Sequence, residues 1–97
     1  MIVHIVMFKF KDENKDSNIE TVKEKLLQLD KDLSSIKKME VGVDFNQSER
    51  AYDLALYTQF DSKEDLNSYA INEKHQEVIK FIKSVTIETK VVDYILD

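Results

Sequence analysis

The sequence predicts an α+β domain with a ferredoxin-like β-α-β-β-α-β order, in which a four-stranded antiparallel sheet carries both helices on one face. Three observations lead to this fold class: an opening stretch that is apolar on two sides, one long helical stripe, and three later segments with strand patterns. The face of the sheet that the helices leave free stays partly apolar. Two copies stacked through that face about a two-fold axis would close an α/β barrel, so we expect a homodimer.

The first ten residues, Met1 to Phe10, predict a strand that must be covered on both sides. Successive side chains of a strand point to opposite faces. Because both faces are mostly apolar, we expect helices of the same chain over one face and a second copy over the other. The first face carries Ile2, His4, Val6, Phe8 and Phe10, and the second carries Val3, Ile5 and Met7. His4 is the one polar side chain among the first eight residues.

The clearest helix of the sequence follows a charged loop at residues 11–16. Ser17 and Glu20 fit a capping box, in which each side chain satisfies a free backbone N–H of the helix start. Apolar residues then recur in steps of three and four, which predicts an amphipathic helix with one buried stripe. The stripe consists of Ile19, Val22, Leu26, Leu29, Leu33 and Ile36.

Two alternating segments come next and predict an antiparallel hairpin, because apolar residues at every second position give a strand one buried face. The polar residues Asn46 to Arg50 would form the turn between them. One face of the first strand carries Met39, Val41, Val43 and Phe45, and one face of the second carries Tyr52, Leu54, Leu56, Thr58 and Phe60.

A broken helix and a last strand complete the predicted order. Asp61 and Ser62 are alternative N-caps for a short helical segment, and Asn72 with Glu73 interrupts it. Both helix segments have an apolar face that we expect to point toward the core. It consists of Leu66, Tyr69 and Ala70 before the break and of Val78, Ile79, Phe81 and Ile82 after it. His75 lies three, four and seven residues before three of these, so it shares their inner face. The Val-, Ile- and Thr-rich stretch from Thr86 to Leu96 predicts the fourth strand.

Composition narrows the function classes. The net charge is −5, and there is no cysteine, no proline and a single glycine. A negative chain argues against binding of nucleic acids or anionic membranes, while the missing residue types exclude thiolate chemistry and glycine-rich phosphate loops. The opening apolar run breaks at Lys9, too early to span a bilayer. We therefore expect one domain over residues 1–97, cytoplasmic, with no cofactor and no nucleic-acid or membrane partner.

Five sequence segments, spread over essentially the whole chain, can be compared with those of known families. They are HIVMFKF at 4–10, EVGVDF at 40–45, YDLALYTQFDS at 52–62, YAINEKHQ at 69–76 and VVDYIL at 91–96. In this order they resemble the stress-responsive dimeric α/β-barrel domain family. The resemblance implies a ferredoxin-like monomer that dimerises through its sheet, with the helices outside. Most members of that family have no assigned reaction.

One plant member of the family is a cofactor-independent polyketide cyclase with a pocket between sheet and helices, and the resemblance carries its residues across. Its essential helix histidine falls on His75, and the tyrosine six residues earlier falls on Tyr69. Its first-strand histidine falls on His4, with Phe8 on the same wall. A third-strand histidine of that pocket falls on Leu54, so one imidazole is absent here. The resemblance thus implies catalytic roles for His75 and Tyr69, and ligand contacts for His4, Phe8 and Leu54.

The side-chain chemistry of His75 and Tyr69 also supports catalytic roles for them, independently of the resemblance. Imidazole, with an unperturbed pKa near 6.5, takes up a proton near neutral pH, and a phenol can stabilise an enolate by hydrogen bonding to its oxygen. The alternative is that His75 stabilises its helix start and bonds a neighbouring backbone carbonyl, while a side chain from an adjacent strand satisfies His4. No local spacing supports a metal site from the two histidines and a carboxylate, so no metal is expected.

Three functions stay open at this point. The first is a structural or small-ligand-binding dimer without turnover, whose ligand would be small and apolar or polyketide-like. The second is a cofactor-free cyclase, lyase or isomerase that uses His75 as general base and Tyr69 as donor to a carbonyl. The third is a haem-binding or quinol-oxidising monooxygenase of the related dimeric barrels, which share the fold but not these motifs. The sequence favours a pocket around His4, Tyr69 and His75 and names no reaction.

Overall fold

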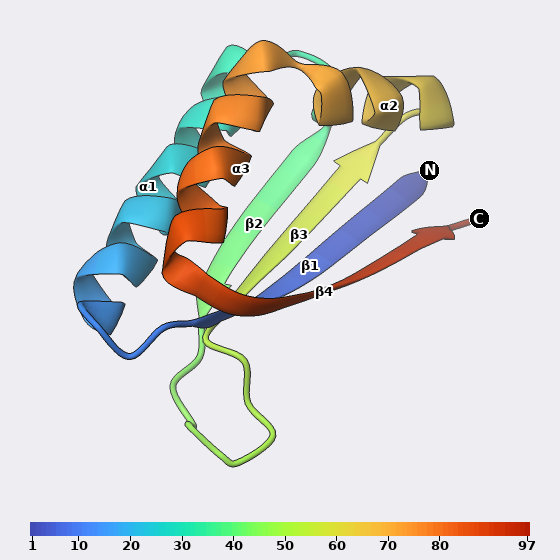
Figure 1. Cartoon of the computed structure of the whole chain (residues 1–97). Helices are drawn as coiled ribbons and strands as arrows, with labels where there is room; N and C mark the ends of the chain where they lie inside the picture. Colours follow the sequence, from blue (N-terminus) through green and yellow to red (C-terminus); the bar gives the residue numbers. More distant parts are fainter.

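The computed structural model describes every residue from Met1 to Asp97. Its elements follow the predicted order, with the second helix divided in two (Figure 1). They are β1 (Ile2–Phe10), α1 (Lys15–Asp32), β2 (Lys38–Val43), β3 (Leu54–Phe60), α2 (Lys63–Ile71), α3 (Glu73–Val85) and β4 (Thr86–Ile95). None of these three helices combines the length and the hydropathy that a membrane span requires.

The four strands form one antiparallel sheet in the order β2-β3-β1-β4. The opening strand β1 is therefore central, and β2 and β4 are the edges. Figure 1 shows α1 and α3 side by side over one face of the sheet, while no element covers the other face. This confirms the predicted ferredoxin-like fold with its helices on one side.

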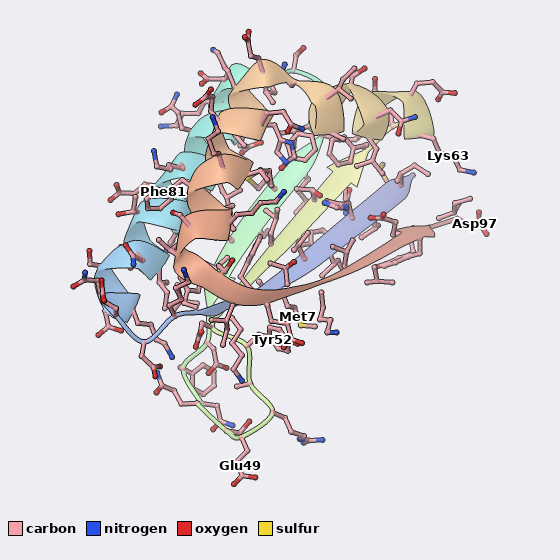
Figure 2. The ribbon with its side chains drawn as sticks, in the orientation of Figure 1. Met7, Glu49, Tyr52, Lys63, Phe81 and Asp97 are labelled. Atoms are coloured by element: carbon pink, nitrogen blue, oxygen red, sulfur yellow. The ribbon has the colours of Figure 1, made fainter.

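The register of the sheet decides which side chains share the covered face. His4 of β1 lies opposite Thr58 of β3 on one side and opposite Asp93 of β4 on the other. Residues two positions along each strand keep the same face. Phe8 and Val91 therefore lie on the helix-covered side with His4, whereas Met7 lies on the bare side. Figure 2 shows Met7 away from the helices, near Tyr52.

The core fills the space between this face and the helices. Sixteen buried apolar residues form one cluster, to which α1 contributes Ile19, Val22, Leu26 and Leu29. Burying an aliphatic side chain of this size stabilises the fold by about 1.5–3 kcal/mol relative to leaving it exposed. The predicted stripe thus anchors α1 against the sheet, although the helix ends before the stripe does.

The ends of α1 correct two sequence predictions. The capping box at Ser17 is wrong, because the helix begins at Lys15 with Asn14 as its N-cap. Asn14 has φ 53°, a left-handed conformation that asparagine tolerates better than most residues. At the other end Leu33 is already extended, so Leu33 and Ile36 lie outside the helix. Both are nevertheless buried, because the chain after the helix still passes over the core.

The hairpin of β2 and β3 is confirmed, but both predicted strands are too long. β2 ends at Val43, and the side chain of Phe45 beyond it is 94% exposed instead of buried. β3 begins at Leu54, so Tyr52 belongs to the connecting loop. The sequence alternation continues past the point where the two strands stop pairing, since alternation reports periodicity and not the presence of a hydrogen-bonded neighbour.

The predicted break in the second helix is confirmed at Asn72. Asn72 ends α2 and begins α3, with ψ 135°, which is outside the helical range. Its side-chain oxygen accepts a hydrogen bond from the backbone N–H of Lys74 at 2.9 Å. Of the two alternative N-caps for α2, the structure uses Ser62, which accepts from the N–H of Asp65 at 3.1 Å. The kink at Asn72 sets the position of the next turn, which carries His75.

Candidate functional site

A cavity of about 210 Å³ lies between the covered face of the sheet and α3. Side chains from β1, β3, β4 and all three helices line it, and eight of the twelve are hydrophobic. The lining consists of His4, Val6, Phe8, Leu26, Leu56, Tyr69, His75, Ile79, Ile82, Lys83, Thr89 and Val91. Four of the five sequence-predicted site residues are therefore brought together here: His4, Phe8, Tyr69 and His75.

Leu54, the fifth, does not line this cavity. It is 1% exposed in the core and instead borders a larger hollow of about 540 Å³ beside the β2–β3 loop. The register explains the difference, since Leu54 pairs with Phe8 at one end of β1, whereas Leu56 pairs with Val6 nearer its middle. Leu56 thus takes the place in the lining that was expected of Leu54.

His75 lies in the first turn of α3, and its orientation is fixed by the helix break. Its Nδ1 is 3.2 Å from the carbonyl oxygen of Ala70, near the end of α2. A carbonyl oxygen can only accept, so Nδ1 carries the hydrogen and Nε2 keeps a lone pair. Burial lowers the pKa of His75, and the charge of His4 acts in the same direction, while the hydrogen bond to Ala70 partly opposes the shift. The imidazole is therefore neutral at neutral pH.

Tyr69, near the end of α2, lies close to both histidines. Its ring centroid is 4.1 Å from that of His75 and 6.3 Å from that of His4. The residue is 1% exposed, and its hydroxyl is the one buried side-chain polar atom of the chain without a hydrogen-bond partner. Burial raises the pKa of this hydroxyl far above its usual range, so it stays protonated and available as a donor.

His4 is tied to the neighbouring edge strand. Its Nδ1 is hydrogen-bonded to the carboxylate of Asp93, directly across from it on β4. The arrangement matches the sequence interpretation in which an adjacent strand satisfies His4. On the other side, the hydroxyl of Thr58 donates to the backbone carbonyl of His4 at 2.8 Å. The contact with Asp93 holds the imidazole, and His4 is part of the cavity lining.

No three His, Asp or Glu side chains lie close enough together to hold a metal ion. The two cavity histidines already use their Nδ1 atoms, His4 for Asp93 and His75 for Ala70.

The sequence pattern missed several lining residues because they come from different elements. Val91 was predicted only as part of a strand rich in Val, Ile and Thr, and nothing local pointed to Lys83.

The comparison with protein families matches this arrangement to a known domain. The model of the stress responsive A/B barrel domain matches residues 2–96. The chain belongs to this family. The resemblance seen in the five sequence segments is thus confirmed, and the cavity of this A/B barrel domain lies where the resemblance placed a pocket.

One protein is similar to this A/B barrel domain in sequence, and two solved structures are similar to it in fold. The stress-response A/B barrel domain-containing protein DABB1 of Arabidopsis thaliana is 31% identical over 108 residues, and the chain spans about half (48%) of its length. A dimeric protein of unknown function from Bacteroides fragilis is 33% identical, with a TM-score of 0.87 over 96% of this chain and 93% of its own. A hydroxynitrile lyase from Passiflora edulis, 20% identical over 99% and 93%, has a TM-score of 0.87 and shares the fold.

Proposed function

We propose that this domain binds a small, largely apolar molecule with a hydrogen-bond acceptor in the cavity between its sheet and α3. The observation that carries this proposal is the buried hydroxyl of Tyr69, which has no partner within the chain. Leaving such a group unsatisfied costs about 1–3 kcal/mol. A carbonyl oxygen of a ligand would accept its hydrogen bond and remove that cost.

The size of the cavity restricts the ligand. Its volume of about 210 Å³ is below the roughly 300–1,000 Å³ of pockets that take drug-sized ligands. The occupant would therefore be small, with its apolar part against side chains such as Phe8, Ile79 and Val91. A haem group is larger than most drug molecules, so the cavity volume gives no support to the haem-binding alternative.

A second candidate, cofactor-independent proton transfer, is favoured by the orientation of His75. Its Nδ1 is held by Ala70, its Nε2 keeps a lone pair, and its lowered pKa keeps it unprotonated. In such a reaction Nε2 would take a proton from the carbon beside a carbonyl, while the electron pair moves onto the carbonyl oxygen. Tyr69 would donate its hydrogen bond to that enolate oxygen. The imidazolium would return the proton to another carbon of the enolate, which completes an isomerisation. Alternatively, the enolate carbon would attack a second carbonyl of the same molecule, and the imidazolium would protonate the resulting alkoxide, which completes a ring closure.

The binding proposal is tested with small cyclic ketones such as cyclohexanone, followed by NMR shifts of the cavity residues. We expect Tyr69→Phe to weaken ketone binding about tenfold, as loss of one well-formed hydrogen bond does. The same change should leave the free protein as stable as the wild type or more stable, because it removes an unsatisfied hydroxyl. A cavity that takes no ketone, or that binds it equally well after Tyr69→Phe, contradicts the proposal.

The proton-transfer candidate has its own test. Exchange of the α-hydrogens of a bound ketone for deuterium, followed by NMR, reports proton abstraction without a known substrate. We expect His75→Ala to abolish the catalysed exchange while the variant stays folded. Exchange at an unchanged rate in the variant would leave the domain as a binding protein only.

We further propose that the chain forms a homodimer through the bare face of its sheet. That face presents Met7, Val92 and Tyr94 with exposed fractions of 41%, 53% and 41%, although Val3 beside them is buried. Exposed apolar side chains gathered on one face of a small domain indicate a protein interface. The similar protein from Bacteroides fragilis is described as dimeric, which supports this assembly.

A further inference from the structure

One end of the cavity carries a lysine, whereas the rest of the lining has no side chain with a permanent charge. Lys83 is the only lysine, arginine, aspartate or glutamate among the twelve lining residues. It lies in the last turn of α3 and is exposed to solvent, so its ammonium group is at the mouth of the cavity and not in its interior. A cation at the mouth of an apolar cavity is suited to a ligand with one anionic end.

The ammonium group of Lys83 has no anionic partner in the chain. None of the ion pairs involves it, whereas five other lysines are paired with carboxylates. Thr89, on the helix-covered face of β4, lines the same cavity. The α3–β4 connection is short, because α3 ends at Val85 and β4 begins at Thr86. An ammonium group and a hydroxyl group thus flank this end of the cavity, and both can donate to a carboxylate.

The polar groups at the other end are separated from Lys83 by apolar side chains. His75 precedes Lys83 by eight residues on α3, which corresponds to roughly 12 Å along the helix axis. Ile79 and Ile82 of the same helix line the cavity in between. A ligand with a negative charge at the Lys83 end therefore extends an apolar body toward Tyr69, where an acceptor would add a hydrogen bond to the free hydroxyl.

We propose that the ligand of this cavity is a small carboxylic acid, whose carboxylate is bound by Lys83 at the mouth and whose apolar body extends toward Tyr69. The inference rests on the proposed binding function and adds the chemical class of the ligand. Charge selects the acid over neutral compounds of equal shape, because a charge-assisted hydrogen bond is stronger than a neutral one.

The test compares octanoate with octanamide, two probes of equal length that differ in charge, by titration followed with NMR. We expect octanoate to bind about fivefold more tightly than octanamide, as one exposed charge-assisted contact allows. Lys83→Met should remove that preference, because methionine keeps the apolar stem without the charge. Lys83→Arg should restore most of it. The octanoate affinity should fall with added salt and the octanamide affinity should not.

Lys80→Met is the matched control, since Lys80 lies one turn earlier on α3 and is not part of the cavity lining. It should leave the affinities for both probes unchanged. If both probes bind in the cavity with equal affinity, or if Lys83→Met leaves the octanoate preference intact, the carboxylate inference is overturned while the binding proposal stands. If neither probe shifts the cavity residues but cyclohexanone does, the carboxylate inference alone fails. If none of the three binds, both proposals fail.

Discussion

His75 and Tyr69 show how a buried position decides what a side chain can do. Each is a common residue on its own, but the fold buries Tyr69 fully and His75 partly, and gives only one of them a partner. The Nδ1 of His75 is satisfied by Ala70, and the hydroxyl of Tyr69 is satisfied by nothing in the chain. The pair therefore consists of a neutral base and a free donor, whose ring centroids lie 4.1 Å apart.

The lowered pKa of His75 predicts a pH dependence of stability. Because burial favours the neutral imidazole, the unfolded chain binds this proton more readily than the folded chain does. The free energy of unfolding should therefore decrease as the pH falls from about 7 through the unfolded pKa near 6.5, and level off below the folded pKa. We expect His75→Gln to show a weaker decrease over this window.

Urea unfolding of the wild type and His75→Gln at about pH 7 and about pH 5.5, on either side of the unfolded pKa, measures this difference. Other titrating groups affect both proteins alike, so the comparison isolates His75. An equal loss of stability in the two proteins would contradict a buried neutral imidazole at this position.

At the scale of elements, the break between α2 and α3 positions the candidate site. Asn72 cannot continue α2 with its extended backbone, and its side chain caps the first turn of α3. The kink leaves the carbonyl oxygen of Ala70 free to accept hydrogen bonds from the Nδ1 of His75 and from the side-chain amide of Gln76. An unbroken helix would direct that carbonyl along its own axis. The interruption seen in the sequence is thus part of how the site is built.

Two capping substitutions separate stability from site geometry. Asn72→Ala and Ser62→Ala each remove one helix cap, so each should lower the free energy of unfolding by about 1 kcal/mol. Only Asn72→Ala should also weaken cyclohexanone binding, because Asn72 lies between the end of α2 that carries Tyr69 and the turn that carries His75, whereas Ser62 lies at the opposite end of α2. Urea unfolding and NMR titration of both variants measure the two effects. Equal ketone affinities in the two variants would mean that the break does not position the site.

At the scale of the whole molecule, the two faces of the sheet differ in what covers them. The helices and the core cover the face that carries His4, whereas the opposite face has no covering element (Figure 1). On the edge strand β4, the apolar residues of the bare face are Val92 and Tyr94, which are 53% and 41% exposed. A sheet with an apolar bare face and a long free edge is prone to association, and a defined dimer controls it.

Val92→Asp tests the dimer at the centre of the bare face. We expect the wild type to sediment at twice the chain mass of 11.4 kDa and the variant to sediment as a monomer, because the substitution buries an unpaired carboxylate in the interface. Ile71→Asp is the control, since Ile71 is 79% exposed on α2 and away from that face. A wild type that sediments as a monomer at micromolar concentration would contradict the assembly.

The sequence by itself determined the order and type of the elements, the inner stripe of α1, the break at Asn72 and the family, because periodicity and capping act between residues a few positions apart. It placed strand ends and the start of α1 less well, since those depend on where a neighbouring strand stops pairing and on the conformation that Asn14 adopts. Only the tertiary structure decided the pairing of His4 with Asp93, the presence of Leu56 and Lys83 in the cavity lining, and the lack of a partner for Tyr69. Those features join residues far apart in the chain, and no local pattern encodes which side chains a folded sheet and helix bring face to face.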